Sequence, residues 1–228
     1  MPDDAGILTI PDVIDRMGAI SEGLAVGDGV RAFNDMYLET TRQVGRAVVD
    51  LHFADSAFLD RLDVRFAQLY FQALNAHEEG RGDAPRCWAA LFDVRAAPDV
   101  ARLQFALAGM NAHISYDLPQ ALVTTVEEFG VDLEQPTVRE DYLTVNDVLA
   151  RTQPIVKDVL LTGPLAELDD AMGEVDDHLG MWAIEGAREM AWRSAQALWA
   201  LRDSWARERY VQGMDRMVEL SSRLLLRL

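Results

Sequence analysis

The stretch that decides the fold is LQFALAGMNAHISYDLPQALV, residues 103–123. On a helix that turns by about 100° per residue, one stripe collects its apolar side chains, namely Leu103, Leu107, Met110, Ile114 and Ala121. Asp117 lies inside that stripe, and His113 lies at its edge one turn earlier. A carboxylate in an apolar stripe is costly unless it is paired or hydrogen-bonded. We therefore expect Asp117 to have a partner, to be protonated or to face a wet cavity.

Pro119 adds a constraint on the same helix. Because proline has no N–H to donate, the carbonyl of Ser115 loses its helical partner and the preceding turn is pushed apart. The distorted turn is the one that holds His113 and Asp117. The stretch therefore predicts a central helix, bent at Pro119, with a polar pocket at its bend.

The rest of the chain indicates helix nearly throughout. Apolar spacings of three, four and seven residues predict helices over 30–51 and about 56–77. Further helices are expected after Pro85, from Pro98, over 137–150 and 154–161, and in a C-terminal tract interrupted near Gly180 and Gly213. No strand alternation, internal repeat or low-complexity linker is evident. We predict one all-α domain over residues 1–228, a bundle of seven to nine helices.

Composition narrows the classes of partner. The net charge of −17 gives a surface that repels phosphate backbones and anionic lipid, so neither nucleic acid nor membrane is expected as a partner. The chain has no apolar run near the ~18–20 residues that span a bilayer, an acidic start, and a single cysteine, Cys87. These features predict a cytoplasmic protein. The amphipathic end RMVELSSRLLLRL, residues 216–228, is expected to pack either internally or against a second copy in a homodimer.

Other helices also place polar side chains on apolar faces. Asp63 lies between apolar residues on a face that includes Tyr70, and Arg188 lies on a face that includes Trp192. An arginine in that position needs a carboxylate, and its flat guanidinium can also stack on tryptophan. If these faces converge, they form a small-molecule site in the bundle core. The expected substrate-binding residues are Asn111, Arg188, Asp63, Tyr70, Tyr142, Asn146 and Trp192.

Three functions are compatible with these residues. The first is a cofactor-free small-molecule enzyme (isomerase, cyclase, dehydratase or hydrolase) in which His113 moves a proton and Asp117 fixes its tautomer. The second is a metal-dependent, phosphoesterase-like hydrolase with His113, Asp117 and Asp63 as ligands. The third is a non-catalytic binding or interaction protein whose buried polar cluster is structural. His52, His77 and His178 lie near helix ends and are weaker candidates.

Four segments carry a resemblance to a known family. FNDMYLETT, LDVRFAQLYFQAL, GMNAHISYDLPQAL and REMAWRSAQAL together resemble a bacterial family of unknown function, most specifically in GMNAHIxxDL. The resemblance implies an all-α domain and singles out Asn111, His113 and Asp117 as family-defining positions. It brings no established reaction.

A more distant resemblance concerns the segment AHISYDLPQAL. It is similar to the His-x-x-x-Asp helix motif of zinc-dependent phospholipases C and S1/P1-type nucleases, which implies a metal-dependent hydrolase. That family builds a three-zinc site from several histidines and an N-terminal tryptophan. This chain begins with Met-Pro, has only four histidines, and lacks a second His-x-x-x-His or His-x-x-x-Glu motif.

Overall fold

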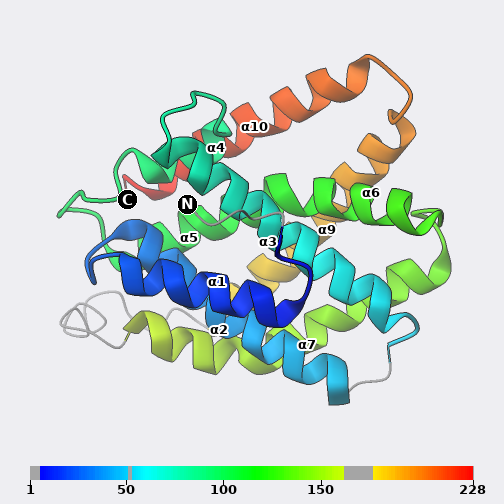
Figure 1. The fold of residues 1–228 in the computed structure, drawn as a ribbon, viewed down its shortest axis with the longest axis horizontal. Helices are drawn as coiled ribbons and strands as arrows, with labels where there is room; N and C mark the ends of the chain where they lie inside the picture. Colours follow the sequence, from blue (N-terminus) through cyan, green and yellow to red (C-terminus); the bar gives the residue numbers. More distant parts are fainter. Residues whose placement is uncertain (1–5, 51–52, 162–176, 228) are drawn as a thin grey trace.

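The computed structural model describes residues 6–50, 53–161 and 177–227, with side chains for all of these except 47–50, 151–161 and 177–183. The chain forms a bundle of helices (Figure 1). Their bounds are α1 (Ile10–Gly23), α2 (Gly29–Asp50), α3 (Ser56–Glu78), α4 (Arg86–Phe92), α5 (Arg102–Ala112), η2 (His113–Asp117), α6 (Leu118–Phe129), α7 (Pro136–Leu161), α9 (Asp177–Ala200) and α10 (Ala206–Leu225). No strand occurs within these ranges, which confirms the predicted all-α multi-helix bundle. The single domain over 1–228 stays a prediction.

The short element η2 lies where many helices meet. It joins α5 to α6 along the chain, and it also contacts α3, α9 and α10. Around it, α2 packs against α1, α5 and α7, while α3 packs against α6, and α10 crosses α4 and α5 (Figure 1). The predicted polar turn is therefore enclosed on several sides by other helices.

The core consists of two apolar clusters. One is formed mainly by α1, α2, α4, α5 and the second half of α3, and the other by α6, α7, α9 and the first half of α3. Phe66 of α3 packs against both clusters. Residues of η2 and its flanks likewise divide between them, with Tyr116 against the first cluster and Ile114 against the second. The polar turn therefore lies at the junction of the two clusters.

Local caps explain where several helices begin and end. Thr9 caps α1 and forms a reciprocal pair with Asp12, each side chain accepting the other's backbone N–H. Asp55 caps α3 by accepting the Phe58 N–H at 3.0 Å. The buried Asp141 of α7 accepts the backbone N–H groups before α3, at 2.8 Å each. Gly130 ends α6 in the left-handed conformation that favours glycine.

The helix distortion falls on the predicted turn. Residues His113–Asp117 form a π-helical turn, in which the N–H of Leu118 bonds to the carbonyl of His113, five residues back. Pro119 is the second residue of α6, where a missing N–H is tolerated. The π-helical turn, with its extra residue, ends two residues before this proline. Such π-helical turns are frequent at functional sites.

Four predicted helix boundaries were wrong. The helix expected from Pro98 begins at Arg102, where the Gln104 side chain accepts the Ala101 N–H at 2.8 Å and caps it. The helices expected over 137–150 and 154–161 form one continuous helix, α7. Gly180 and Gly213 lie inside α9 and α10, since a glycine weakens a helix without ending it. Within residues 177–227, the tract is interrupted at residues 201–205.

The C-terminal helix α10 presents two faces. Val218 and Ser222 are buried against the bundle, whereas Met217, Leu220 and Leu224 are exposed. Internal packing therefore accounts for one face only, and the homodimer stays a prediction. None of the helices among the described residues combines the length and apolar character that crossing a membrane requires.

Gly109→Ala is expected to destabilise the protein. A Cβ at Gly109 of α5 would lie 2.8 Å from the Cβ of Phe33 in α2 and 2.4 Å from its ring, so the two helices would have to separate. Overpacking of this kind costs about 1–3 kcal/mol, which urea unfolding can measure. Gly186→Ala in α9 meets no atom within 4 Å and serves as the matched control, because alanine there gains up to about 1 kcal/mol of helix propensity. Equal stability of Gly109→Ala and wild type would contradict this account of the α2–α5 contact.

Candidate active site

The π-helical turn brings its histidine and its carboxylate together. His113 Nδ1 lies 2.9 Å from Asp117 Oδ2. Both residues are buried, with exposures of 3% and 1%. The two positions were expected to share a side of the helix, and the structure places them in direct contact.

A third residue holds the pair, and no pattern in the sequence indicated it. Trp88, fully buried in the short helix α4, donates its indole Nε1–H to Asp117 Oδ2 at 3.0 Å. The start of α4 is fixed in turn by Asp215 of α10, which accepts the N–H of Arg86 at 3.2 Å and that of Cys87 at 3.0 Å. Trp88 therefore reaches Asp117 because α10 positions α4. Cys87 itself is a buried thiol.

Aromatic rings surround the His113 imidazole. Phe66 of α3 stacks on it with ring centroids 3.5 Å apart and an interplanar angle of 6°. Tyr37 of α2 meets it edge-on at 4.4 Å. Three more rings lie between 5.8 and 6.3 Å away, those of Phe33, Tyr70 and Trp88. The imidazole is thus held in one plane by rings from α2, α3 and α4.

This enclosure disfavours charge on both members of the pair. Burial raises the pKa of the Asp117 carboxyl well above its usual range, although the hydrogen bond from Trp88 opposes the shift. Burial also lowers the pKa of His113 well below its usual value. The imidazole is therefore neutral at physiological pH, as a general base must be before it accepts a proton, although the same burial weakens it as a base.

The distal nitrogen of the imidazole has no partner. His113 Nε2 is buried and makes no hydrogen bond to the described residues. Guanidinium nitrogens aside, Asp63 Oδ2 shares this condition in the described part of the chain, and the buried Tyr37 Oη and Thr41 Oγ1 have no partner beyond each other. Each such atom costs about 1–3 kcal/mol when it lacks a partner, against a total stability of about 5–15 kcal/mol for a typical protein. Such atoms require a partner from outside the protein chain, either a buried water or a ligand.

These four atoms belong to neighbouring faces of α2, α3 and η2. Tyr37 and Thr41 are one turn apart on α2, and Asp63 precedes Phe66 by one turn on α3. Burial raises the pKa of the Tyr37 hydroxyl, and the charges of Asp63 and Asp117 raise it further, so Tyr37 lies within electrostatic reach of both carboxyls. Burial, with a smaller effect of Asp60, raises the pKa of Asp63 to about 7. Tyr37 and Thr41 were not anticipated, because a hydroxyl on an apolar helix face is an ordinary core residue.

Arg188 lies in a different cluster, with three of the other expected residues. Its Nε donates to Asn146 Oδ1 at 2.5 Å, and its Nη2 donates to the Tyr142 carbonyl at 2.8 Å. Its guanidinium covers the Tyr142 ring at 4.2 Å, and the Tyr142 hydroxyl donates to the Arg188 carbonyl. Trp192 packs on Tyr142 at 5.0 Å and carries Arg139, not Arg188, over its ring. The carboxylate expected beside Arg188 is absent among the described residues, and these contacts fasten α9 to α7.

Asn111 also faces away from the His–Asp pair. Its Nδ2 donates to the Ser221 and Ser222 hydroxyls of α10 at 2.8 and 3.0 Å. It therefore joins α5 to α10. The expected convergence of all the polar faces is replaced by separate sites. Among the described residues, the site around His113 is the one that gathers unpartnered buried atoms other than guanidinium nitrogens.

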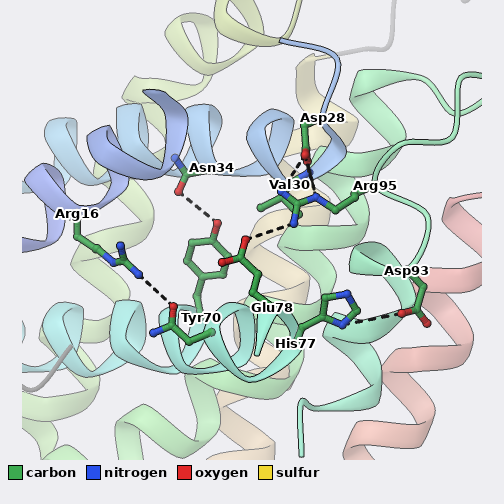
Figure 2. Close-up of polar contacts among 10 residues, drawn as sticks. Arg16, Asp28, Val30, Asn34, Tyr70, His77, Glu78, Asp93 and Arg95 are labelled. Atoms are coloured by element: carbon green, nitrogen blue, oxygen red, sulfur yellow. Dashed lines mark hydrogen bonds and ion pairs between the residues drawn. The ribbon is translucent and has the colours of Figure 1, made fainter. Parts of the chain in front are cut away.

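Tyr70 contributes its ring to the site and its hydroxyl elsewhere. The hydroxyl donates to Asn34 Oδ1 of α2 at 3.3 Å, as Figure 2 shows. The same view contains the ion pairs of Arg95 with Asp28 and Glu78, and the contact of His77 with Asp93 at 3.9 Å (Figure 2). These contacts tie loops to helices at some remove from Asp117. His52 and the side chain of His178 lie outside the described residues.

The residues expected for a metal site do not form one here. No group of three or more His, Cys, Asp or Glu side chains is arranged to hold a metal ion within the ranges that the structure describes. Asp63 therefore does not complete a ligand set with His113 and Asp117.

Trp88→Phe is expected to destabilise the protein and to raise the pKa of Asp117 further. The change keeps an aromatic ring but removes the indole N–H, so the buried carboxyl loses a donor at a cost of about 1–3 kcal/mol. Urea unfolding at pH 7 measures this loss. Trp205→Phe, at a residue that is 79% exposed, is the matched control and should unfold like wild type. A Trp88→Phe protein as stable as wild type would show that the indole bond to Asp117 contributes nothing.

Comparison with known proteins places the chain in one family. A family model described as "Family of unknown function (DUF5995)" matches residues 10–228. No curated protein and no solved structure matches the chain. The matched range contains every helix described above and the four buried polar atoms of the site. The chain therefore belongs to the DUF5995 family.

Proposed function

We propose that this chain is a small-molecule enzyme in which His113 transfers a proton inside the helical bundle. The observation that carries the proposal is the His113 ring itself, bonded through Nδ1 to Asp117 and left without a partner at Nε2. A hydrogen bond to one ring nitrogen fixes the tautomer and orientation of an imidazole, and the other nitrogen then faces the reacting group. Asp117 is the positioning residue, and Trp88 positions Asp117.

The placement of the pair supports acid–base chemistry without a cofactor. The imidazole is kept neutral by burial, its plane is fixed by the Phe66 stack, and Asp117 is its one ionisable hydrogen-bond partner among the described residues. The π-helical turn supplies a backbone distortion of the kind that clusters at functional sites. Isomerisation, dehydration, cyclisation and hydrolysis all remain open as the net reaction.

His113→Asn is expected to abolish turnover while preserving the fold. The asparagine amide can occupy the place of Nδ1 and keep the bond to Asp117, whereas the Nε2 position is lost. Loss of a general acid–base group lowers rates by about 100-fold or more. The wild-type protein and the variant are each incubated with a soluble metabolite extract, and time-dependent changes are followed by untargeted mass spectrometry.

The controls separate a catalytic role from a structural one. His77→Asn alters a half-buried histidine whose ring packs at a tilt against that of Phe92, and it should behave like wild type. Asp117→Asn places an amide N–H against Nδ1, imposes the opposite tautomer, and should also abolish turnover. A His113→Asn protein that converts the same metabolites at the wild-type rate would refute the proposed role.

The second candidate is a non-catalytic binding protein, favoured by the near-complete burial of His113 and Asp117. It predicts that no metabolite in the extract changes with time, even with the wild-type protein. In that outcome the enzyme proposal fails, and the buried pair is a structural or ligand-holding element.

A further inference from the structure

We propose that the unpartnered atoms around His113 form a binding site for an organic ammonium ion, recognised by Asp63 together with Tyr37 and Thr41. This inference rests on the proposed function, because it names the substrate class of the same interior site. It assigns roles to two hydroxyls, on Tyr37 and Thr41, that take no part in the proton transfer.

The polar atoms of the site can all accept hydrogen bonds. The Asp63 carboxylate accepts hydrogen bonds, the Tyr37 and Thr41 hydroxyl oxygens can accept them, and His113 Nε2 accepts when Nδ1 carries the proton shared with Asp117. Tyr37, Thr41 and His113 are each more than nine-tenths buried. An ammonium group is the complementary partner, since it offers three donors and no acceptor.

The carboxyls of the site also lack a positively charged partner. Asp63 and Asp117 form no ion pair with an arginine or lysine among the described residues. The arginines nearest to Asp63 along α3, Arg61 and Arg65, both bind Glu128 of α6 instead. An anionic ligand would meet two carboxyls and no cation, whereas a cationic ligand would supply the missing positive charge.

Aromatic side chains also surround the site. Tyr37, Phe66, Phe33, Tyr70 and Trp88 enclose the His113 ring. Aromatic faces attract ammonium groups, and the attraction is stronger when the cation is desolvated. The net charge of −17 also raises the concentration of cations near the surface.

The site in its unliganded form keeps its charge low with protons. Burial and Asp60 hold the pKa of Asp63 at about 7, and the titratable group that interacts with it from another element is Tyr37 of α2. A bound ammonium therefore competes with a proton on Asp63. With a pKa of about 7, affinity should be about tenfold weaker at pH 6 than at pH 8, with release of a proton on binding at pH 6.

The test is the binding of n-propylammonium to the full-length protein, measured by NMR and calorimetry at constant ionic strength. The matched probes are propan-1-ol and propionate, which keep the chain length and change the charge. We expect saturable binding of n-propylammonium only, with the stated dependence on pH. Equal binding of propan-1-ol, or no saturable binding of n-propylammonium at pH 8, would overturn the proposal.

Variants locate the binding within the molecule. Asp63→Asn keeps the shape of the side chain and should weaken n-propylammonium binding at least tenfold, and Thr41→Val should weaken it by a smaller factor. Asp203→Asn removes one charge from a side chain that is 93% exposed and should bind as wild type does. If Asp63→Asn fails to fold, Thr41→Val decides. Unchanged affinity in a folded Asp63→Asn protein would show that the cation binds to the acidic surface instead.

Failure of this inference is distinguishable from failure of the proposed function. If n-propylammonium does not bind but His113→Asn still abolishes metabolite turnover, the ammonium class is refuted and the proton-transfer role stands. If n-propylammonium binds through Asp63 but turnover is independent of His113, the ammonium site stands and the catalytic role falls.

Discussion

The structure depends on one buried carboxyl, that of Asp117. A carboxyl in a core of this kind must be hydrogen-bonded or neutral, because its desolvation costs several kcal/mol otherwise. His113 and Trp88 both bind the same oxygen, Oδ2. The Asp117 carboxyl thereby links the π-helical turn to α4, and Asp215 in turn links α4 to α10. Two carboxyl groups thus connect three segments that are distant in sequence.

Sequence reasoning succeeded where the cause is local. The apolar stripe of residues 103–123 predicts a buried helix, and the missing N–H of Pro119 places the distortion on His113–Asp117. Both effects act within a single helical segment of the chain, so periodicity and proline chemistry suffice to predict them. The pairing of His113 with Asp117 follows for the same reason, since i and i+4 side chains lie on one side of a helix.

Sequence reasoning failed where the cause is the angle at which helices meet. Arg188 and Asn111 lie on apolar faces as expected, but they bind α7 and α10 rather than Asp117. Periodicity states which face of a helix is buried, and it does not state which partner that face meets. Trp88 is the opposite case, a residue of the site that sequence patterns did not identify. In a short apolar helix, a tryptophan that donates a hydrogen bond looks the same in sequence as one that only packs. Its role depends on Asp215, which lies 127 residues further along the chain.

The buried polar groups around His113 differ from those in the rest of the core, and the functional proposal rests mainly on this difference. Other buried polar side chains of this chain have hydrogen-bond partners. Asn34 donates to the Met17 carbonyl and the Ser21 hydroxyl, and Asp141 accepts two backbone N–H groups. Because the chain supplies hydrogen-bond partners for these buried groups, the unpartnered atoms around His113 need a local explanation. Natural proteins break such rules at functional sites and compensate for the cost in stability elsewhere. The position of the exceptions, at the junction of two well-packed apolar clusters, is where a ligand could supply the missing partners while the surrounding helices keep their places.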